Sequence, residues 1–577
     1  MNILKIYQHK IIDLLILLNK KNILIIPEKL ESIVVEIPPA EQMSDLSCNA
    51  SLILSKINKK KPMEIALLLK DELLKNFDEF NGIEVAKPGF LNISFKSSFW
   101  EMFINNILKQ KKDYGFTNEN LKIKKYNIEF VSANPTGPLH VGHCRGAILG
   151  DVLANLVSLC GHNVVKEYYI NDYGNQIKNF TLSVFYRINE ILKNIKFPQN
   201  KDLYPGSYIV DIANSIINEK KIKDYDNFDS IKNDLTKSSL RYSMQMIKED
   251  LSLLGINHDV FTSETSLVEN NVVLKAIEIL KKKDFVYKGF IEQPKGTSKE
   301  NWKPRKQLLF KSTNFGDDID RSLQKEDETW TYFANDIAYH HNKISKGYDV
   351  LINILGSDHT GYIKRIESAV KALSNNKTLL KCKTCQLVKL IKNGQEVKMS
   401  KRSGEYITSK DLFKEVGKDV IRFIMLNRNN EVELDFDFNK VTEKTKDNPV
   451  FYVQYAYARI NSIFRNLKIK IDSNISLSDE KFYLDKYAID ILKKISEWPK
   501  CVEISLNRLE PHRITYYLYE LSTLFHSYWN LGDGNDEYKF VISDKPQSKS
   551  KLLLLQSFCV VIENGMKILG VSTPSKM

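Results

Sequence analysis

The sequence has few of the features that mark a secreted or membrane protein. Only seven of its 577 residues are cysteine, and this odd, scattered set argues against a disulfide framework. No stretch has the length of a membrane span. The apolar run at residues 11–18 is interrupted by Asp13 and followed by Lys20 and Lys21, where a signal peptide would carry small residues. We therefore expect an amphipathic helix there, and a cytoplasmic protein that does not associate with a membrane.

The sequence also lacks the commonest nucleotide-binding motifs, because it contains neither a P-loop nor a GxGxxG string. A single CxxC, formed by Cys382 and Cys385, has no second pair and no nearby histidine to complete a tetrahedral metal site. We therefore expect two structural thiols and no metal ion held by protein side chains.

The length and the charge of the chain limit its class. A chain of 577 residues is too long for a single core. We expect an α+β domain at 1–112, a doubly wound (Rossmann-like) α/β domain at 113–445 with a helical insertion at about 180–270, and an all-α bundle at 446–577. The formal charge of +13 suits a polyanionic partner, although a lysine-rich surface can also simply be solvated.

The middle domain opens with a β-α-β pattern, which binds its ligand where the strand ends face the helix N-terminus. Its expected elements are a strand at 126–130, a turn at 134–138, a helix at 141–159, a strand at 164–170, and later a strand at 349–355 and a helix at 363–373. In the first domain we expect a helix beginning at 45–47 and running through 54, a helix at 63–75 and a hairpin at 83–95.

Two short strings, His140-Val141-Gly142-His143 and Lys398-Met399-Ser400-Lys401, carry donors suited to the phosphates of ATP. The two histidines are three residues apart at the start of the expected helix, so both face the same side of it. The helix dipole and the free N–H groups at the helix start point in the same direction. A polar loop with two ammonium groups suits a pyrophosphate leaving group. Taken alone, the histidines also fit helix caps and the lysines fit an ordinary basic loop, so neither string decides the function.

Residues 129–143 resemble the HIGH region of the class I aminoacyl-tRNA synthetases, and in particular of the bacterial-type arginyl-tRNA synthetases. Residues 397–404 are similar to the KMSK loop of the same family. The resemblance covers nearly the whole chain, and its motifs are specific to the arginine enzymes. Further similar segments follow the family order at 85–90, 167–172, 332–340 and 448–456.

The resemblance implies that L-arginine is activated with ATP and Mg²⁺ to arginyl-adenylate and is then transferred to the terminal adenosine of tRNA-Arg. It implies catalytic roles for His140, His143, Lys398 and Lys401. It implies ATP contacts for Gly142, Gly356, Asp358, His359, Met399 and Ser400. For the segment at 356–359, a structural turn is the rival interpretation.

The resemblance also implies an arginine pocket, with Glu129 and Asp336 at the guanidinium and Asn134 at the α-amino end. A planar cation is best held by a carboxylate fork and an aromatic face. Tyr332 lies one helical turn before Asp336, so its ring can supply that face. Lysine should be rejected, because the fork would stay half-satisfied.

For the partner tRNA, the resemblance implies that residues 446–577 contact the anticodon arm and that the N-terminal domain contacts the elbow. Five residues of one expected helix fit a surface that stacks on tRNA bases and pairs with phosphates. Residues so close in sequence spread over several faces of a helix, so some of the five must be core. These residues are Tyr452, Gln454, Tyr455, Tyr457 and Arg459. A monomer is expected.

Two departures from the family pattern, Cys144 and Glu405, remove no catalytic donor. Two alternatives remain open at this point. One is another HIGH-type class I synthetase, and the other is a non-catalytic tRNA-binding paralogue, which the intact histidines and lysines of the two strings argue against.

Overall fold

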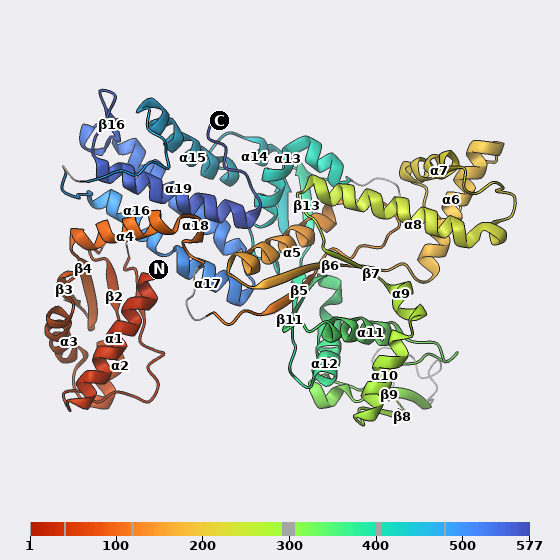
Figure 1. Cartoon of the computed structure of the whole chain (residues 1–577), viewed down its shortest axis with the longest axis horizontal. Helices are drawn as coiled ribbons and strands as arrows, with labels where there is room; N and C mark the ends of the chain where they lie inside the picture. Colours follow the sequence, from red (N-terminus) through yellow and green to blue (C-terminus); the bar gives the residue numbers. More distant parts are fainter. Residues whose placement is uncertain (1, 40–41, 117–120, 291–305, 398–406, 478–479) are drawn as a thin grey trace. The chain divides into compact units, whose positions relative to one another are not determined.

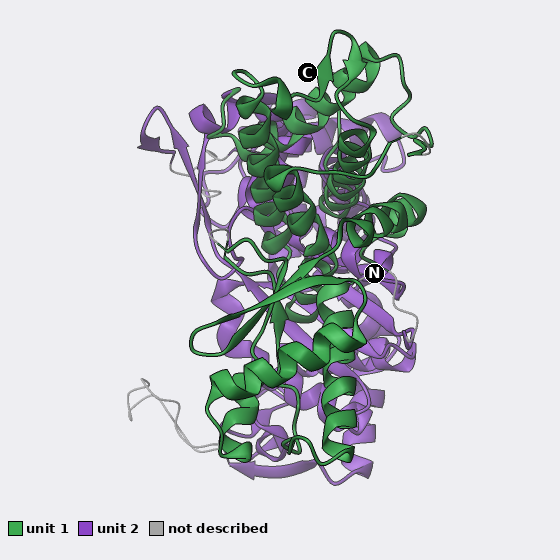
Figure 2. Cartoon of the chain, turned by 90° about the vertical axis from the view of Figure 1, so that its left-hand side faces the viewer, with its two compact units in different colours: residues 1–119, 444–577 green, residues 120–443 purple. Residues whose placement is uncertain are grey.

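The computed structural model describes every residue except 1, 40–41, 117–120, 291–305, 398–406 and 478–479 (Figure 1). The chain divides into two compact units, which Figure 2 colours separately. Unit 1 consists of residues 1–119 and 444–577, and unit 2 consists of residues 120–443.

A five-stranded parallel sheet forms the centre of unit 2, in the order β12-β11-β5-β6-β7. The sequence order of the strands runs outward in both directions from the neighbours β5 and β11, which places a ligand crevice at their carboxyl ends. This topology confirms the predicted doubly wound fold. The strands are β5 (Lys125–Glu129), β6 (Asn163–Ile170), β7 (Val260–Ser263), β11 (Val350–Gly356) and β12 (Leu379–Cys385).

Helices cover both faces of this sheet, as right-handed crossovers in opposite directions require. The helix α5 (Val141–Leu159) follows β5, whereas α11 (Tyr332–Ser345) and α12 (Ile363–Ser374) lie on the other side (Figure 1). The helix α5 packs closely against Phe130, which follows β5: a Cβ at Gly150 would be 2.2 Å from Cγ of Phe130. The predicted strand–turn–helix–strand pattern is therefore confirmed.

The rest of unit 2 lies in two insertions and a C-terminal segment. Between β6 and β7 stand α6 (Asn175–Lys193), α7 (Ser207–Glu219) and α8 (Phe228–Leu253), which enclose a small core around Phe180. Between β7 and α11 come α9 (Glu264–Glu269), α10 (Val272–Lys282), β8 (Val286–Phe290), β9 (Lys306–Phe310), η3 (Ser312–Phe315) and β10 (Arg321–Ser322). After β12 come β13 (Val388–Lys392), β14 (Gln395–Glu396), α13 (Ser409–Met425), β15 (Leu434–Asp437) and α14 (Phe438–Thr442).

The N-terminal part of unit 1 is an α+β fold with a four-stranded sheet in the order β1-β2-β4-β3. The predicted hairpin and the predicted helices at 11–18 and 63–75 are confirmed. The helix expected from Asp45 is wrong at its start, because Leu46–Cys48 pairs with β4 and the helix begins at Ala50. The elements are α1 (Ile3–Lys20), β1 (Val35–Glu36), β2 (Leu46–Cys48), α2 (Ala50–Asn58), α3 (Pro62–Asn76), β3 (Phe80–Ala86), β4 (Phe90–Phe95), α4 (Ser97–Gln110) and η1 (Lys111–Asp113).

The C-terminal part of unit 1 is helical, with one short hairpin. Its last helix, α19, is the single described helix that is long and apolar enough to cross a membrane, so the expectation that no stretch has the length of a membrane span was wrong. Of its apolar window, 83% is buried within the fold, as in a core helix. The elements are α15 (Pro449–Asn466), α16 (Lys486–Ser496), α17 (Trp498–Arg508), α18 (His512–Leu531), η5 (Asp536–Tyr538), β16 (Val541–Ile542), β17 (Lys545–Pro546) and α19 (Lys549–Leu569).

Candidate active site

The start of α5 is closed by the two histidines of the first string. Nδ1 of His140 accepts a hydrogen bond from the backbone N–H of Gly142 at 3.1 Å, and Nδ1 of His143 accepts one from the backbone N–H of His140 at 3.3 Å. Because Nδ1 is an acceptor in both rings, the neutral form of each carries its proton on Nε2. The two ring centroids are 3.9 Å apart. Both histidines therefore cap the start of the helix through Nδ1, and the proton of each neutral ring is on Nε2.

The glycine and the cysteine of this region are explained by the space around them. A Cβ at Gly142 would be 2.9 Å from Cε1 of His140, so a larger residue would displace the first ring. Cys144 is buried, and burial raises the pKa of its thiol to about 12. Cys144 is therefore a protonated packing residue that adds no charge beside the histidines.

The first string pairs directly with the chain that follows the second. His140 and Thr408 form an antiparallel β-bridge, and the backbone N–H of Ser409 donates to the carbonyl of Leu139 at 2.9 Å. The predicted donors of the second string precede this bridge and lie outside the described residues; they are Lys398, Met399, Ser400 and Lys401. The bridge therefore places Thr408, the residue before α13, beside the first string.

Arg145 ties α5 to the chain on either side of α13. Its guanidinium donates to the carbonyls of Gln386 at 3.1 Å, Val432 at 2.7 Å and Asn429 at 2.9 Å. The side chain is 1% exposed. A guanidinium with five fixed donors suits such a set of carbonyls, so Arg145 positions the scaffold next to the first string.

We expect Arg145→Met to lower the free energy of unfolding by about 3 kcal/mol, because the buried carbonyls lose their charged donor. Urea unfolding of purified protein measures this change. Arg241→Met is the matched control, since Arg241 pairs with Glu219 at 2.6 Å on the surface, where its loss should cost less than about 1 kcal/mol. An equal fall in the free energy of unfolding in the two variants would show that the buried hydrogen bonds of Arg145 stabilise the fold no more than a surface ion pair does.

Glu129, at the end of β5, lies in a buried polar cluster. Its Oε2 accepts a hydrogen bond from Nζ of Lys343 at 2.7 Å, and its Oε1 accepts one from Oγ of Ser132 at 3.2 Å. Ser132 and Val131 have φ values of 41° and 71°, a strained conformation for such residues. The strained turn after β5 thus brings Ser132 back onto the carboxylate that precedes it.

Asp336, on α11, is a partly buried carboxyl group in the same pocket. Burial raises its pKa to about 7, and the neighbouring carboxylates of Glu129 and Glu264 act in the same direction. The hydroxyl of Tyr362 donates to its Oδ2 and acts against them. Among the described residues, no lysine or arginine forms a salt bridge with Asp336, and the positive charge of Lys343 offsets only part of the rise in its pKa.

Stability should depend on pH through Asp336. Its pKa is 3.8 when exposed and about 7 in the fold, so between these values the folded state holds a proton that the unfolded state has released. The free energy of unfolding should therefore fall as the pH rises from about 4 to about 7. We expect Asp336→Asn to remove this fall, so that its stability relative to wild type increases over that range.

Urea unfolding at several pH values between 4 and 8 measures this difference. Asp284→Asn is the control, because the Asp284 side chain is 91% exposed and pairs with Lys311 at 3.1 Å. A constant difference between Asp336→Asn and wild type across this range would count against a protonated Asp336.

Two aromatic rings lie near the acids of this pocket. The ring centroids of Tyr169, on β6, and Tyr339, on α11, are 4.3 Å apart. Burial raises the pKa of Tyr169, and the carboxylates of Glu264, Asp336 and Glu129 add to this effect. Several acids and two aromatic rings in contact thus converge on one place, which suits a planar cation.

The other residues predicted for the amino-acid pocket are more exposed. Tyr332 begins α11, its side chain is 71% exposed, and Nζ of Lys325 lies 5.5 Å from its ring centroid. Nδ2 of Asn134 donates to Oε1 of Gln176, on α6, at 2.6 Å. The structure therefore brings Glu129 and Asp336 together, and places Tyr332 on the surface one turn away.

The predicted segment at 356–359 follows β11, at the same sheet edge as Glu129. It forms the turn η4 (Ser357–Tyr362). Nε2 of His359 lies 3.6 Å from Oδ2 of Asp358, and the two side chains are 60% and 81% exposed. A Cβ at Gly356 would be 2.5 Å from Oδ1 of Asp358, so a larger residue there would displace the exposed Asp358 side chain.

Sequence reasoning missed the residues that complete the pocket. One signal was present: Lys343 follows Asp336 by seven residues, or two helical turns, on the same face of α11. No pattern pointed to Ser132, Tyr169, Tyr339 or Tyr362 as pocket residues.

The candidate tRNA-binding residues of α15 divide between surface and core. Gln454 and Tyr457 are buried, and Tyr457 donates to Oε1 of Glu563 at 2.6 Å. Tyr452, Tyr455 and Arg459 are partly exposed. Two of the five are thus packing residues, in agreement with the expectation that some must be core.

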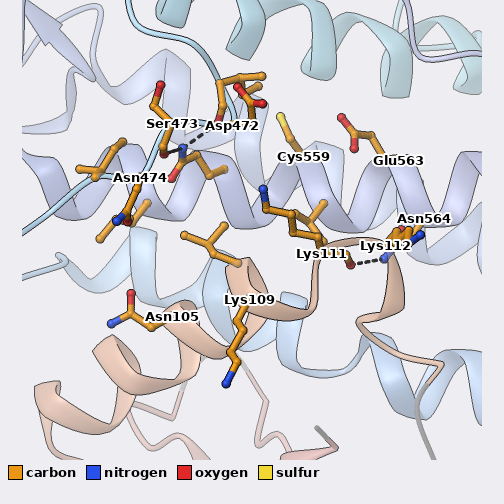
Figure 3. Close-up of a pocket in the computed structure, with 16 residues that line it drawn as sticks. Asn105, Lys109, Lys111, Lys112, Asp472, Ser473, Asn474, Cys559, Glu563 and Asn564 are labelled. Atoms are coloured by element: carbon orange, nitrogen blue, oxygen red, sulfur yellow. Dashed lines mark hydrogen bonds between the residues drawn. The ribbon is translucent and has the colours of Figure 1, made fainter.

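A cavity of about 390 Å³ in unit 1 contains none of the predicted site residues (Figure 3). It lies between the end of α4, the segment 471–475 and α19, with Lys111, Cys559 and Glu563 among its lining residues. Cys382 and Cys385 lie on β12, and burial raises the pKa of both thiols. Among the described residues, no group of three or more histidines, cysteines or acids could hold a metal ion.

Three family models match this chain. The family model described as "tRNA synthetases class I (R), catalytic domain" matches residues 103–466. The model "Arginyl tRNA synthetase N terminal domain" matches residues 6–95, and "DALR anticodon binding domain" matches residues 453–577.

Two curated relatives are named arginine–tRNA ligase. The protein of Pelagibacter ubique is 57% identical over 100% of both chains, and that of Ehrlichia ruminantium strain Welgevonden is 47% identical over 98% of both. The solved structure of Thermus thermophilus arginyl-tRNA synthetase shares the fold, with a TM-score of 0.70 at 17% identity over 99% of this chain and 100% of that one. The chain therefore belongs to the arginyl-tRNA synthetase family of the class I aminoacyl-tRNA synthetases.

Proposed function

We propose that this chain is an arginine–tRNA ligase, which activates L-arginine with ATP and transfers the arginine to the terminal adenosine of tRNA-Arg. The observation that carries this function is the 57% identity to a protein of that name, from end to end of both chains. The intact first string and the acidic, aromatic pocket beside it supply the two kinds of site that the reaction needs.

The arginine carboxylate attacks the α-phosphorus of ATP, and pyrophosphate leaves. No protein nucleophile takes part, so the protein acts by positioning and by stabilising charge. His140 and His143 direct their Nε2–H donors at the phosphates, beside the N-terminus of α5. Lys398 and Lys401 neutralise the leaving pyrophosphate, and Met399 and Ser400 line the ATP site with them. The pairing of Thr408 with His140 supports these roles, because Thr408 follows the second string by seven residues.

ATP itself lies along the carboxyl ends of β5 and β11. Gly142 leaves room for the phosphates beside His140, and Gly356, Asp358 and His359 contact ATP from the end of β11. Mg²⁺ accompanies ATP and shields its phosphate charge. Bound with ATP, the ion would be held mainly by phosphate oxygens and water.

Arginine is bound through its guanidinium by Glu129 and Asp336, and through its α-amino end by Asn134. The convergence of acids and rings at Glu129 and Asp336 supports these roles. Tyr332 contributes an aromatic face when its exposed ring turns toward the substrate. Lysine is rejected because it lacks the plane and the several donors of the guanidinium.

The transfer step needs tRNA-Arg bound along the chain. The division into domains at 1–112, 113–445 and 446–577 assigns the elbow to the first and the anticodon arm to the last. The match of residues 453–577 to an anticodon-binding model supports this assignment. Tyr452, Tyr455 and Arg459 are the candidates for base and phosphate contacts. The enzyme works as a monomer in the cytoplasm, without a membrane.

Amino-acid-dependent exchange of pyrophosphate into ATP tests this function, measured with and without tRNA. Arginine should support exchange and lysine should not. Exchange driven by another amino acid would identify a different class I synthetase. The absence of both exchange and tRNA charging would identify a non-catalytic paralogue and overturn the proposal.

A further inference from the structure

A buried lysine contacts one of the two acids of the pocket. The Lys343 side chain is 0% exposed, although lysine is rarely buried without a partner. Its Nζ lies 2.7 Å from Oε2 of Glu129, 3.5 Å from Oδ1 of Asn353 and 4.2 Å from the ring centroid of Tyr339. A carboxylate, an amide oxygen and a ring face thus surround one ammonium group.

The neighbouring residues leave this contact little freedom. Asn353 lies opposite Glu129 on the adjacent strand β11, and its Nδ2 is 3.0 Å from Nε2 of His340. Nδ1 of His340 donates to the carbonyl of Asp336 at 2.8 Å, because Nε2 faces a donor and must accept. Burial lowers the pKa of His340 to about 3, so this ring is neutral. Lys343 is therefore the ammonium that pairs with Glu129, and the adjacent histidine adds no positive charge.

We propose that Lys343 is a positioning residue for arginine binding. It orients Glu129 and supplies the counter-charge of that carboxylate. Of these two acids, Asp336 is then the one left for the incoming guanidinium to neutralise. This inference rests on the proposed function, in which Glu129 and Asp336 bind arginine. The Lys343 ammonium and the Ser132 hydroxyl hold one carboxylate oxygen each, so the plane of Glu129 is set before the substrate arrives. A preorganised carboxylate binds a planar fork with less loss of entropy.

The charges around the pocket give this arrangement a measurable consequence. With Glu129 paired to Lys343, arginine binding removes one proton, from Asp336, whose pKa is about 7. Without the ammonium, two carboxylates face one pocket as like charges, and the pair holds its proton to higher pH. Among the described residues, the titratable and charged groups near these acids are Lys343, Glu264, Tyr362, Tyr169, Tyr339, Asp172, Glu167, His340, Cys382, Arg321 and Arg365.

The test is the KM for arginine in pyrophosphate exchange, measured between pH 6 and pH 9 on the full chain with tRNA present. In wild type, KM should fall with rising pH and level off above about pH 7. In Lys343→Met, the pH at which KM levels off should move up by about one unit or more, which raises KM about fivefold at pH 7 and about tenfold at pH 6. At pH 9, KM should return to within about threefold of wild type, a recovery that merely damaged packing would not show.

Three further variants separate charge from packing. Lys343→Arg keeps the charge, so the pH at which KM levels off (the levelling point) should stay that of wild type even if KM rises. Ser132→Ala removes a neutral donor to Glu129, so it too should leave the levelling point in place. Lys346→Met, at an exposed lysine just beyond α11, should change nothing. If Lys343→Met does not fold, Asn353→Asp draws the ammonium away from Glu129 and should move the levelling point up in its place.

The outcomes also separate this inference from the proposed function. If Glu129→Gln and Asp336→Asn leave the arginine KM unchanged, the proposed substrate pocket is wrong. If those variants raise KM but Lys343→Met (or Asn353→Asp in its place) keeps the levelling point of wild type, only the role of Lys343 is overturned. A loss of kcat in Lys343→Met with no change in KM at any pH also overturns it.

Discussion

Replacing either His140 or His143 by asparagine should slow arginine-dependent pyrophosphate exchange by ~10²–10³-fold at saturating arginine, the usual cost of losing one donor to a transition state. Asparagine is a good helix cap, and its Oδ1 can replace the Nδ1 acceptor that each ring now offers at the start of α5. The substitution therefore removes Nε2–H and keeps the helix. Turnover should fall while the arginine KM changes little, since the donors act on charge that develops during reaction.

The control for this experiment is His162→Asn, just beyond the other end of α5, where the ring accepts from the backbone N–H of Lys124 at 3.3 Å. Its exchange rate should stay within about threefold of wild type, as expected for a surface substitution. If the His140 and His143 variants kept wild-type rates with an unchanged melting temperature, these histidines would be helix caps and nothing more.

Glu129→Gln and Asp336→Asn should each lower kcat/KM for arginine by roughly 30- to 1,000-fold, because a buried, hydrogen-bonded charge pair loses one partner. The KM for ATP should change much less. The two variants should differ in stability, however. Glu129→Gln leaves the buried Lys343 ammonium without its counter-charge, which should cost about 3 kcal/mol, whereas Asp336→Asn removes an acid that burial disfavours.

Kinetics with arginine and urea unfolding of the same preparations measure both effects. A shared loss of ATP affinity would point to general damage in either variant. Equal stabilities for Glu129→Gln and Asp336→Asn would mean that the Lys343 contact is weaker than its 2.7 Å distance and complete burial indicate.

The parts of the fold that the sequence predicted are those set by local pattern. The strand β5, the turn after it and the helix α5 follow one another within about 35 residues, and each has its own periodicity and end signals. The error at Leu46–Cys48 arose where pairing decided the structure. Those three residues pair with β4, more than forty residues away, and this pairing overrides a helical pattern.

The same distinction holds for the site. The first string was recognised because its residues are adjacent. The structure confirms that both rings cap the helix through Nδ1, and the role of the histidines toward ATP stays a prediction. The pair of Glu129 and Lys343 spans 214 positions, and no spacing rule links a strand end to the face of a helix so far away. The raised pKa of Asp336 likewise depends on burial and neighbouring acids that only the fold brings together.

Charging of tRNA by the purified chain directly measures whether the chain is an arginine–tRNA ligase. Each standard amino acid, radiolabelled, is incubated separately with ATP, Mg²⁺ and total tRNA, and acid-precipitable label is counted. Arginine alone should become attached to tRNA, and the product should lose its label when the ester bond is hydrolysed by mild base. Attachment of a different amino acid, or of none, would contradict the assignment.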